Sequence, residues 1–381
     1  MIYLDNAATT WPKPRETVAA IEECIRTAGA NPGRGGHQMS LAAGRIILEA
    51  REAVAELFNI GDPAQVVFCG NATEAVNLAL KGFIKPGEHI ITTTMEHNAT
   101  VRPLYVLARQ GVEITEVPCS KEGVLDPENI RKAIKTTTRL IAVVHASNVT
   151  GTIMPVEQIG RIARDAGVAF MVDAAQTAGY LDIDVVKMNI DLLAFTGHKG
   201  LYGPQGTGGL YIRPKLELNP IFQGGTGSKS EMLEQPEDMP DKYESGTPNT
   251  PGIAGLGAGI RYIRSRGLDK IRDHEEGLMS RFIDGLQQLK KTEIYGLARP
   301  KERVPVVSIN IKDQDSSEVA FALDRVFQIA CRSGLHCAPA AHKTIGTLDR
   351  GTVRFSLSMY NTAEEIDQVL EALAQVIDEF S

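Results

Sequence analysis

The sequence predicts an α/β protein with a mostly parallel β-sheet that is covered by helices on both faces. Three observations predict this class. Strand-like and helix-like patterns alternate through residues 65–172. The strand-like runs are apolar along their length and rich in β-branched residues, which is typical of strands buried on both faces. After Pro214 the pattern changes, and a chain of 381 residues has room for about two to three domains, so we expect a smaller second domain.

The larger part of the chain begins with helical patterns. One follows Pro14 and runs through Cys24, and an amphipathic helix is expected at residues 40–58, beyond a polar, glycine-bearing loop at residues 31–37. From there the expected elements alternate. Strands are expected at residues 65–68, 89–92, 112–117, 140–144, 168–172 and 192–195, and helices at 73–83, 100–110 and 156–166.

The remaining chain reads as a smaller α+β domain that the extreme N-terminus joins. Residues 223–244 are polar and rich in glycine, proline and acidic residues, and are expected to form a long functional loop. Helices are expected at residues 250–266, from there to about residue 291, and at 316–329 and 362–380, with strands at 304–311 and 352–356. The predicted domains are therefore residues 15–250, and residues 1–14 together with 251–381.

Composition excludes several classes of function. A net charge of -7 argues against nucleic-acid binding. No apolar stretch approaches the ~20 residues that span a bilayer, and the N-terminal sequence lacks the basic and apolar regions of a secretory signal. The cysteines are odd in number, widely spaced and without a CxxC pair, so we expect free thiols in a reducing cytoplasm and no bound metal. They are Cys24, Cys69, Cys119, Cys331 and Cys337.

The stretch at residues 191–211, DLLAFTGHKGLYGPQGTGGLY, is the strongest candidate site. An apolar run ends in Thr196-Gly-His198-Lys199, and six glycines fall between Gly197 and Gly209. This arrangement predicts a buried strand that delivers side chains to a cleft, where glycines let the backbone approach a ligand closely. A lysine held there loses solvation, its pKa falls from ~10.4, and its amine can form a Schiff base with an aldehyde. The alternative is a glycine-rich surface loop with an ordinary lysine.

Other polar residues follow neighbouring strands, at the edge of the sheet where ligands bind in such folds. The free N–H groups and the Thr73 hydroxyl of residues 70–74 suit a phosphate, although Thr73 could simply cap a helix. Asp173 ends an apolar run and needs a cationic partner or several donors, and a protonated pyridine nitrogen would serve. Gln176 could donate to a phenolic oxygen, and His97 could lie flat on an aromatic ring or only begin a helix. An aromatic aldehyde with these features is pyridoxal phosphate, held by Lys199 and Asp173.

Two further stretches bear on a substrate. The loop at residues 332–339, RSGLHCAP, places Cys337 between small, flexible neighbours, where His336 or Arg332 could favour its thiolate. The alternative is that Cys337 is a buried structural thiol, but this interpretation suits Cys331 better than Cys337. Arg354 alternates out of a short strand and could bind a substrate carboxylate through its forked guanidinium, or be a surface arginine.

With these residues in view, the sequence resembles the class V aminotransferase family, and within it the cysteine desulfurases of the selenocysteine-lyase-like branch. The resemblance spans residues 3–362. Its motifs are NATEAVN at 71–77, EH at 96–97, SNVTGT at 147–152, DAAQ at 173–176, TGHK at 196–199, ESGTPN at 244–249 and the cysteine loop at 332–339. The sequence departs from the family at Ala72, where relatives often carry a second threonine, and at Leu335, where some carry a second histidine.

The resemblance implies fold type I of the pyridoxal-phosphate-dependent transferases, with a seven-stranded type of sheet, and a homodimer. It implies that Lys199 holds the aldehyde, Asp173 the ring nitrogen and Gln176 the phenolic oxygen, while His97 stacks on the ring. Thr73 beside Ala72, with Thr196 and His198, would bind the phosphate, and Thr247 would reach it from the partner subunit. By the same resemblance, the substrate would be bound by Arg354, Asn148, His37 and Arg332. The attacking thiol would be that of Cys337.

The activity that the resemblance implies is desulfuration of L-cysteine to L-alanine. Lys199 moves the Cα proton, the sulfur passes to Cys337 as a persulfide, and a sulfur-acceptor protein receives it, as in iron–sulfur cluster assembly. Two alternatives remain open at this point. One is another enzyme of the same fold, such as a selenocysteine lyase, a transaminase, or a kynureninase- or epimerase-like enzyme, which needs no thiol at Cys337. The other is a non-catalytic protein that only retains the fold.

Overall fold

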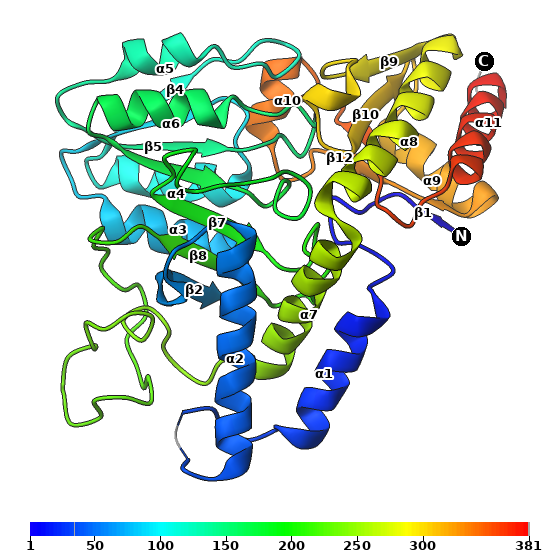
Figure 1. Cartoon of the computed structure of the whole chain (residues 1–381). Coiled ribbons are helices and arrows are strands. Elements are labelled where there is room, and N and C mark those ends of the chain that lie inside the picture. The colour runs from blue at the N-terminus through cyan, green and yellow to red at the C-terminus, as the bar shows by residue number, and fades with distance from the viewer. Residues whose placement is uncertain (34, 380–381) are drawn as a thin grey trace.

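The computed structural model describes residues 1–33 and 35–379. Arg34 of the predicted loop at residues 31–37, and Phe380 of the predicted last helix, lie outside the described residues. The larger domain is built on a seven-stranded sheet with the strand order β2-β8-β7-β6-β5-β3-β4 (Figure 1). The strands are β2 (Val66–Cys69), β3 (His89–Thr93), β4 (Glu113–Val117), β5 (Thr138–Val144), β6 (Ala169–Asp173), β7 (Leu192–Thr196) and β8 (Gly208–Ile212).

Most of this sheet is parallel, as the sequence predicted. The pairs β4–β3, β3–β5, β5–β6 and β6–β7 are parallel, whereas β8 runs antiparallel to both β7 and β2. The predicted strands are confirmed to within about two residues, but β8 was not predicted as a strand. It begins with Gly208-Gly209, and a Cβ on Gly209 would lie 2.5 Å from Cζ of Phe195 and 2.7 Å from the Val67 carbonyl oxygen. The close packing of β8 between β7 and β2 therefore requires glycine at position 209. The same glycines made this segment resemble a loop in the sequence.

Helices cover both faces of the sheet. Ile141 and Val143 of β5 belong to one apolar core, and their neighbours Leu140 and Ala142 belong to another. Because side chains alternate along a strand, the two cores lie on opposite faces. The first core contains residues of α2 (Gln38–Leu57), α5 (Pro127–Ala133), α6 (Val156–Asp165) and α7 (Thr250–Arg266), and the second contains residues of α3 (Ala72–Phe83) and α4 (Asn98–Arg109).

A smaller antiparallel sheet with the order β12-β13-β10-β9 forms the second domain. Its strands are β9 (Thr292–Tyr295), β10 (Val306–Ile311), β12 (Arg332–Gly334) and β13 (Thr352–Ser356), and its helices are α8 (Leu268–Gln288), α9 (Ser316–Phe327), α10 (Pro339–Ile345) and α11 (Ala363–Glu379). Its core also includes Ile2 and Leu4 from the N-terminus. The domain boundaries after residues 14 and 250 stay a prediction, because α7 shares the core of the larger domain with α2.

The N-terminal segment connects the two domains. Strand β1 (Ile2–Tyr3) pairs in parallel with β11 (Ile329–Ala330), and the next residues run along β13. The Thr10 N–H then donates to the His198 carbonyl oxygen at 3.0 Å, beside the loop that follows β7. In Figure 1 this dark-blue segment leads from the smaller domain to α1 (Arg15–Thr27), which lies beside α7.

Between β8 and α7 the chain forms neither helix nor strand, in agreement with the long loop predicted at residues 223–244. Glu244 holds the end of this loop: its carboxylate accepts hydrogen bonds from Arg51 at 2.7 and 2.9 Å and from the Phe68 N–H at 2.6 Å. Within residues 1–33 and 35–379, no helix combines the length and the apolar character that crossing a bilayer would need.

Candidate active site

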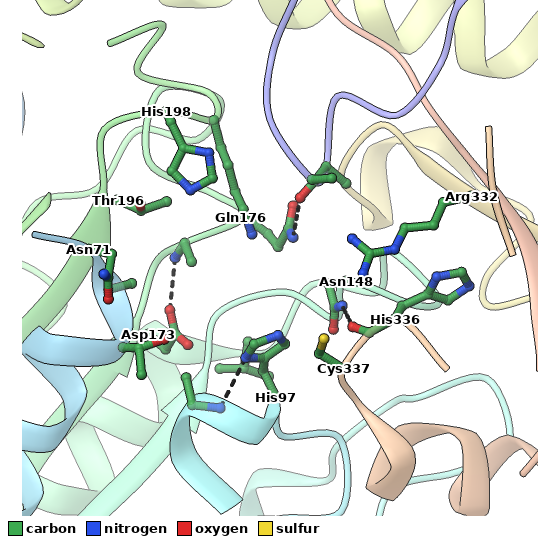
Figure 2. A pocket seen from close by; sticks show the side chains of 18 of the residues that line it. Asn71, His97, Asn148, Asp173, Gln176, Thr196, His198, Arg332, His336 and Cys337 are labelled. Atoms are coloured by element: carbon green, nitrogen blue, oxygen red, sulfur yellow. Dashed lines mark hydrogen bonds between the residues drawn. The ribbon is translucent and has the colours of Figure 1, made fainter. Parts of the chain in front are cut away.

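An inner cavity of about 210 Å³ lies where the parallel strands end, between the two domains (Figure 2). Nearly all of the predicted site residues line it. They are Ala72, Thr73, His97, Asn148, Asp173, Gln176, Thr196, His198, Lys199, Arg332, Cys337 and Arg354. Seven segments that the sequence analysis singled out separately therefore meet around one space.

The loop after β7 fixes the backbone of Lys199. The Gly197 N–H donates to the Thr207 carbonyl oxygen at 2.8 Å, and a Cβ on Gly197 would lie only 2.1 Å from Oγ1 of Thr207. The Lys199 carbonyl oxygen accepts hydrogen bonds from the Tyr202 N–H at 2.8 Å and from the Thr10 hydroxyl at 3.0 Å. Burial of the amino group, together with the positive charge of Arg354, lowers the pKa of Lys199 to about 8. This is the direction that the sequence analysis expected for a lysine at the end of a buried strand.

Asp173 is the last residue of β6 and is buried at the floor of the cavity. Its Oδ1 accepts a hydrogen bond from the Ala175 N–H at 2.9 Å, the one hydrogen bond that its side chain makes with the described residues. Burial raises the pKa of Asp173, and the nearby Lys199 opposes this change. The carboxylate is thus short of partners, and a cation bound in the cavity would stabilise it.

His97 both begins a helix and lines the cavity, and its stacking on an aromatic ring stays a prediction. Its Nδ1 accepts a hydrogen bond from the Ala99 N–H at 3.0 Å and caps α4. Burial, reinforced by the charge of Lys199, lowers the pKa of His97 to about 4. The ring is therefore neutral at pH 7, and since Nδ1 is an acceptor, its proton is on Nε2.

One end of the cavity carries free hydrogen-bond donors. Asn71, not Thr73, caps α3 by accepting a hydrogen bond from the Glu74 N–H at 3.0 Å, so the helix-capping interpretation of Thr73 is wrong. The N–H groups of Ala72 and Thr73 precede the first intrahelical hydrogen bond of α3, from Ala75 to Asn71. Nδ1 of His198 is buried and has no hydrogen-bond partner among the described residues. In the view of Figure 2, Asn71, Thr196 and His198 lie together at this end.

The opposite end carries two arginines. Arg354 is 1% exposed, and its Nη2 forms an ion pair with Oδ1 of Asp5 at 2.7 Å, while its Nη1 donates to the Asn148 carbonyl oxygen at 3.1 Å. Its Nε has no partner among the residues that the structure describes. The surface-arginine alternative is therefore wrong, and a donor of Arg354 is left for a ligand. Arg332, in β12, lines the same end of the cavity.

Cys337 lies on the short connection between β12 and α10, where the sequence analysis expected a longer loop. His336 and Cys337 both have positive φ angles, 49° and 58°, an uncommon backbone conformation for residues other than glycine. The Asn98 N–H donates to the Cys337 carbonyl oxygen at 2.9 Å, and the Asn148 side chain donates to that of His336 at 2.7 Å. Among the five free cysteines, Cys337 is exposed, whereas Cys24 is buried and the other three are half-buried.

The expectation that His336 supplies positive charge to Cys337 is not met. His336 is buried, its Nε2 contacts the Thr352 hydroxyl at 3.0 Å, and burial together with Arg354 lowers its pKa to about 2. The imidazole is thus neutral over the whole physiological range. Arg332 and Arg354 are the cations that remain near the thiol.

Two predicted site residues, His37 and Thr247, do not line the inner cavity. Nδ1 of His37 accepts a hydrogen bond from the Ser40 N–H at 3.3 Å at the start of α2. The Thr247 hydroxyl accepts one from the Asn31 side chain at 3.3 Å, on the rim of a separate hollow of about 410 Å³. The prediction for Thr247 concerned the site of a partner subunit, and it stays a prediction.

The family model of class V aminotransferases matches residues 2–369. The chain belongs to the class V aminotransferase family. It is 38% identical to a probable cysteine desulfurase of Methanothermobacter thermautotrophicus, over 98% of this chain and 94% of that protein. It is 34% identical to a cysteine desulfurase of Serratia proteamaculans, over 99% and 93% of the two chains.

Solved structures of relatives share the whole architecture of this class V aminotransferase. An apo cysteine desulfurase of Thermococcus onnurineus superposes with a TM-score of 0.94 at 38% identity, over 99% of this chain and 95% of that one. A cysteine desulfurase of Escherichia coli, in an S-sulfonic acid form, superposes with a TM-score of 0.88 at 27% identity, over 99% and 94%. The predicted resemblance and the predicted fold type I are both confirmed.

Sequence reasoning missed several residues of this family member's site. Asp5 pairs with Arg354, and Ala7 and Ala8 line the cavity, but the sequence analysis assigned no site role to the N-terminal residues. Asn71 caps α3 at the cavity wall, and the Ala7 carbonyl oxygen accepts a hydrogen bond from the Gln176 side chain at 3.2 Å. A carboxylate directly after the apolar pair Tyr3-Leu4 was the available signal, because a half-buried carboxylate favours a cationic partner.

Proposed function

We propose that this protein is a pyridoxal-phosphate-dependent cysteine desulfurase, which converts L-cysteine to L-alanine and transfers the sulfur to Cys337 as a persulfide. One observation carries the proposal: Lys199, Asp173 and the exposed thiol of Cys337 line a single cavity. A lysine and an aspartate alone would suit any member of the family, whereas the thiol singles out sulfur transfer. The names of the relatives point to the same activity.

The residues of the inner cavity fit pyridoxal phosphate. The unpartnered Nδ1 of His198, the first N–H groups of α3 and the hydroxyls of Thr73 and Thr196 would bind the phosphate. The under-partnered carboxylate of Asp173 would hold the ring nitrogen, and the neutral ring of His97 would stack on the cofactor. Gln176 has a second amide hydrogen, beyond the one that Ala7 accepts, for the phenolic oxygen.

When bound, the cofactor supplies an aldehyde that captures the substrate amine and a ring that accepts the electrons of the Cα–H bond. Residues of the protein supply the base that moves the Cα proton and the charge that stabilises the ring nitrogen. Lys199 would hold the aldehyde carbon, and its amine, with a pKa of about 8, would serve as the general base that takes the Cα proton. Asp173 keeps a positive charge on the ring nitrogen by pairing with it.

Cys337 accepts the sulfur. Its thiolate attacks the substrate sulfur, so a new S–S bond forms while the Cβ–S bond breaks. The electron pair of the broken bond stays with the three-carbon product, which takes up a proton and leaves as alanine. Atoms and electrons balance without an added oxidant, because the two sulfurs together lose two electrons when the S–S bond forms, and Cβ gains that pair when the Cβ–S bond breaks.

Arg354 is the proposed anchor of the substrate carboxylate, together with Asn148 and Arg332, while His37 stays a prediction without contact to this cavity. Replacing Arg354 with lysine removes the forked donor but keeps the charge. We expect the KM for cysteine to rise about 10- to 100-fold, the equivalent of about 1.5–3 kcal/mol for a hydrogen bond to a charged group. Binding of cysteine and of cysteamine, which lacks the carboxylate, is measured from the change in cofactor absorbance. Equal losses for both ligands would contradict the anchor role.

The lowered pKa of Lys199 predicts how cofactor uptake depends on pH. The neutral amine reacts with an aldehyde, and a folded-state pKa of about 8, below the ordinary 10.5, means that this form prevails above about pH 8. The rate at which cofactor-free protein takes up pyridoxal phosphate should therefore rise with pH, reach about half of its maximum near pH 8 and level off about one pH unit higher. Stopped-flow absorbance between pH 6 and pH 10 measures it. A rate that still rises at pH 10 would indicate an ordinary lysine.

The decisive experiment is an assay of alanine formation. Purified protein loaded with pyridoxal phosphate is incubated with L-cysteine and a reductant, and alanine and sulfide are quantified. Equal amounts of both are expected from a desulfurase. Turnover that requires a 2-oxo acid acceptor and yields no sulfide would instead show a transaminase, and selenocysteine offered in competition tests the lyase alternative.

We further propose a cytoplasmic homodimer in which Thr247 reaches the cofactor phosphate of the partner subunit. Thr247 is exposed and lies outside the inner cavity of its own chain, which supports a role in another subunit. The free cysteines suit a reducing compartment.

A further inference from the structure

Cys337 lines a second space besides the inner cavity. This outer groove has a volume of about 360 Å³ and lies between α3 and α4. Its walls are residues spaced three or four apart on the two helices, so each helix presents one face to it. They include Thr73, Asn77 and Lys81 of α3, and Asn98, Arg102 and Val106 of α4. The thiol of Cys337 therefore stands at the boundary between the inner cavity and the outer groove.

The outer groove is cationic. Lys81 and Arg102 are exposed, and neither forms an ion pair with any residue that the structure describes. No aspartate or glutamate is among the described residues that line it, and His97 at its inner end is neutral. Arg102 is close enough to His97 to contribute to the lowering of its pKa. On a chain with a net charge of -7, two unpaired cations in the groove that Cys337 lines form a local positive patch.

We propose that the outer groove binds the acceptor that removes sulfur from Cys337, and that this acceptor is a small anionic thiol of about the size of a short peptide. The inference rests on the proposed desulfurase function and specifies its second substrate. Access from the groove would let the acceptor reach the persulfide while the inner cavity still holds the amino-acid product. The groove's volume lies at the small end of the range for sites that bind small molecules, which suits an acceptor of about the size of a short peptide.

The transfer step is a thiol–persulfide exchange. The acceptor thiolate attacks the outer sulfur of the Cys337 persulfide, forming a new S–S bond, while the bond between that sulfur and Sγ of Cys337 breaks. Cys337 leaves as a thiolate, ready for the next cysteine, and the acceptor becomes the persulfide. Lys81 and Arg102 bind the acceptor's carboxylates and hold its sulfur near Cys337.

The experiment separates sulfur loading from sulfur removal. Holoenzyme is given one equivalent of cysteine, the alanine formed is quantified, and the persulfide on the Cys337 peptide is measured by mass spectrometry. The loaded enzyme then receives either glutathione or glutathione diethyl ester, in which both carboxylates are masked. We expect the double variant Lys81→Gln/Arg102→Gln to discharge sulfur to glutathione about 10-fold more slowly than wild type, and to the ester at the wild-type rate. Raising the salt concentration should reduce the difference for glutathione.

The control is Arg109→Gln, which removes a cation from the same helix but outside the outer groove. It should discharge at the wild-type rate with both thiols. If wild type and the double variant discharge sulfur to glutathione at the same rate, the outer groove does not bind the acceptor. This conclusion would hold even if alanine formation is normal. A dependence on Lys81 and Arg102 that appears with a longer acidic thiol peptide, and not with glutathione, would overturn the small-thiol assignment. Absence of alanine in the wild-type loading step would instead refute the desulfurase function itself.

Discussion

Replacing Lys199 with alanine is expected to abolish the visible absorbance of lysine-bound cofactor and to reduce alanine formation by about 10³-fold or more. Two roles are lost together, because the same amine holds the aldehyde and moves the Cα proton. The backbone of the loop should survive, since its hydrogen bonds come from the Thr10 hydroxyl and the Tyr202 N–H to the carbonyl oxygen of residue 199. Absorbance spectra after addition of pyridoxal phosphate, and alanine assays, measure the two effects.

Lys13 offers a matched control for this variant. Burial lowers the pKa of Lys13 to about 8 as well, and its Nζ donates to the His198 carbonyl oxygen at 2.7 Å, but its side chain does not line the inner cavity. Lys13→Ala should therefore keep the cofactor absorbance. Retention of the absorbance in Lys199→Ala, or its loss in Lys13→Ala, would show that the wrong amine has been assigned.

Replacing Cys337 with serine is expected to reduce alanine formation from cysteine by about 10³-fold or more, the scale seen when a nucleophile is removed. A hydroxyl at this position is a far poorer nucleophile and cannot carry the sulfur as a persulfide. The cofactor absorbance should be unchanged, because Cys337 lies at the end of the cavity away from Thr196 and His198 (Figure 2). Single-turnover alanine assays, with mass spectrometry of the Cys337 peptide, measure the loss.

Cys331→Ala controls for the general loss of a thiol near the site. Cys331 lies six residues earlier in the same segment, and burial raises its pKa to about 12, so it holds little thiolate at neutral pH. Its replacement should leave desulfuration intact. Full activity of Cys337→Ser on cysteine would show that Cys337 does not carry the sulfur as a persulfide. The main support for the proposed desulfurase function would then be lost.

Local sequence was sufficient to predict the elements whose two ends are marked by capping or helix-ending residues. The predicted helix at residues 250–266 coincides with α7, because Asn249 caps it and Gly267, with a φ of 86°, ends it. Two helices, α5 and α10, were not predicted, and each is only seven residues long. Seven residues are about two helical turns, too few for a periodic pattern to emerge. The strand β8 was hidden by glycines that its packing requires.

For the site, the sequence alone determined which residues bring chemistry and near which strand ends they lie. A lysine in a glycine-rich turn, an aspartate after an apolar run and a cysteine among small residues are local patterns, and they are visible without coordinates. Only the tertiary structure decided their partners and protonation: Asp5 reaches Arg354 across 349 positions of chain, His336 is neutral, and Cys337 opens onto two spaces at once. Burial and charge–charge distances set these properties, and both depend on segments that meet only when the chain has folded.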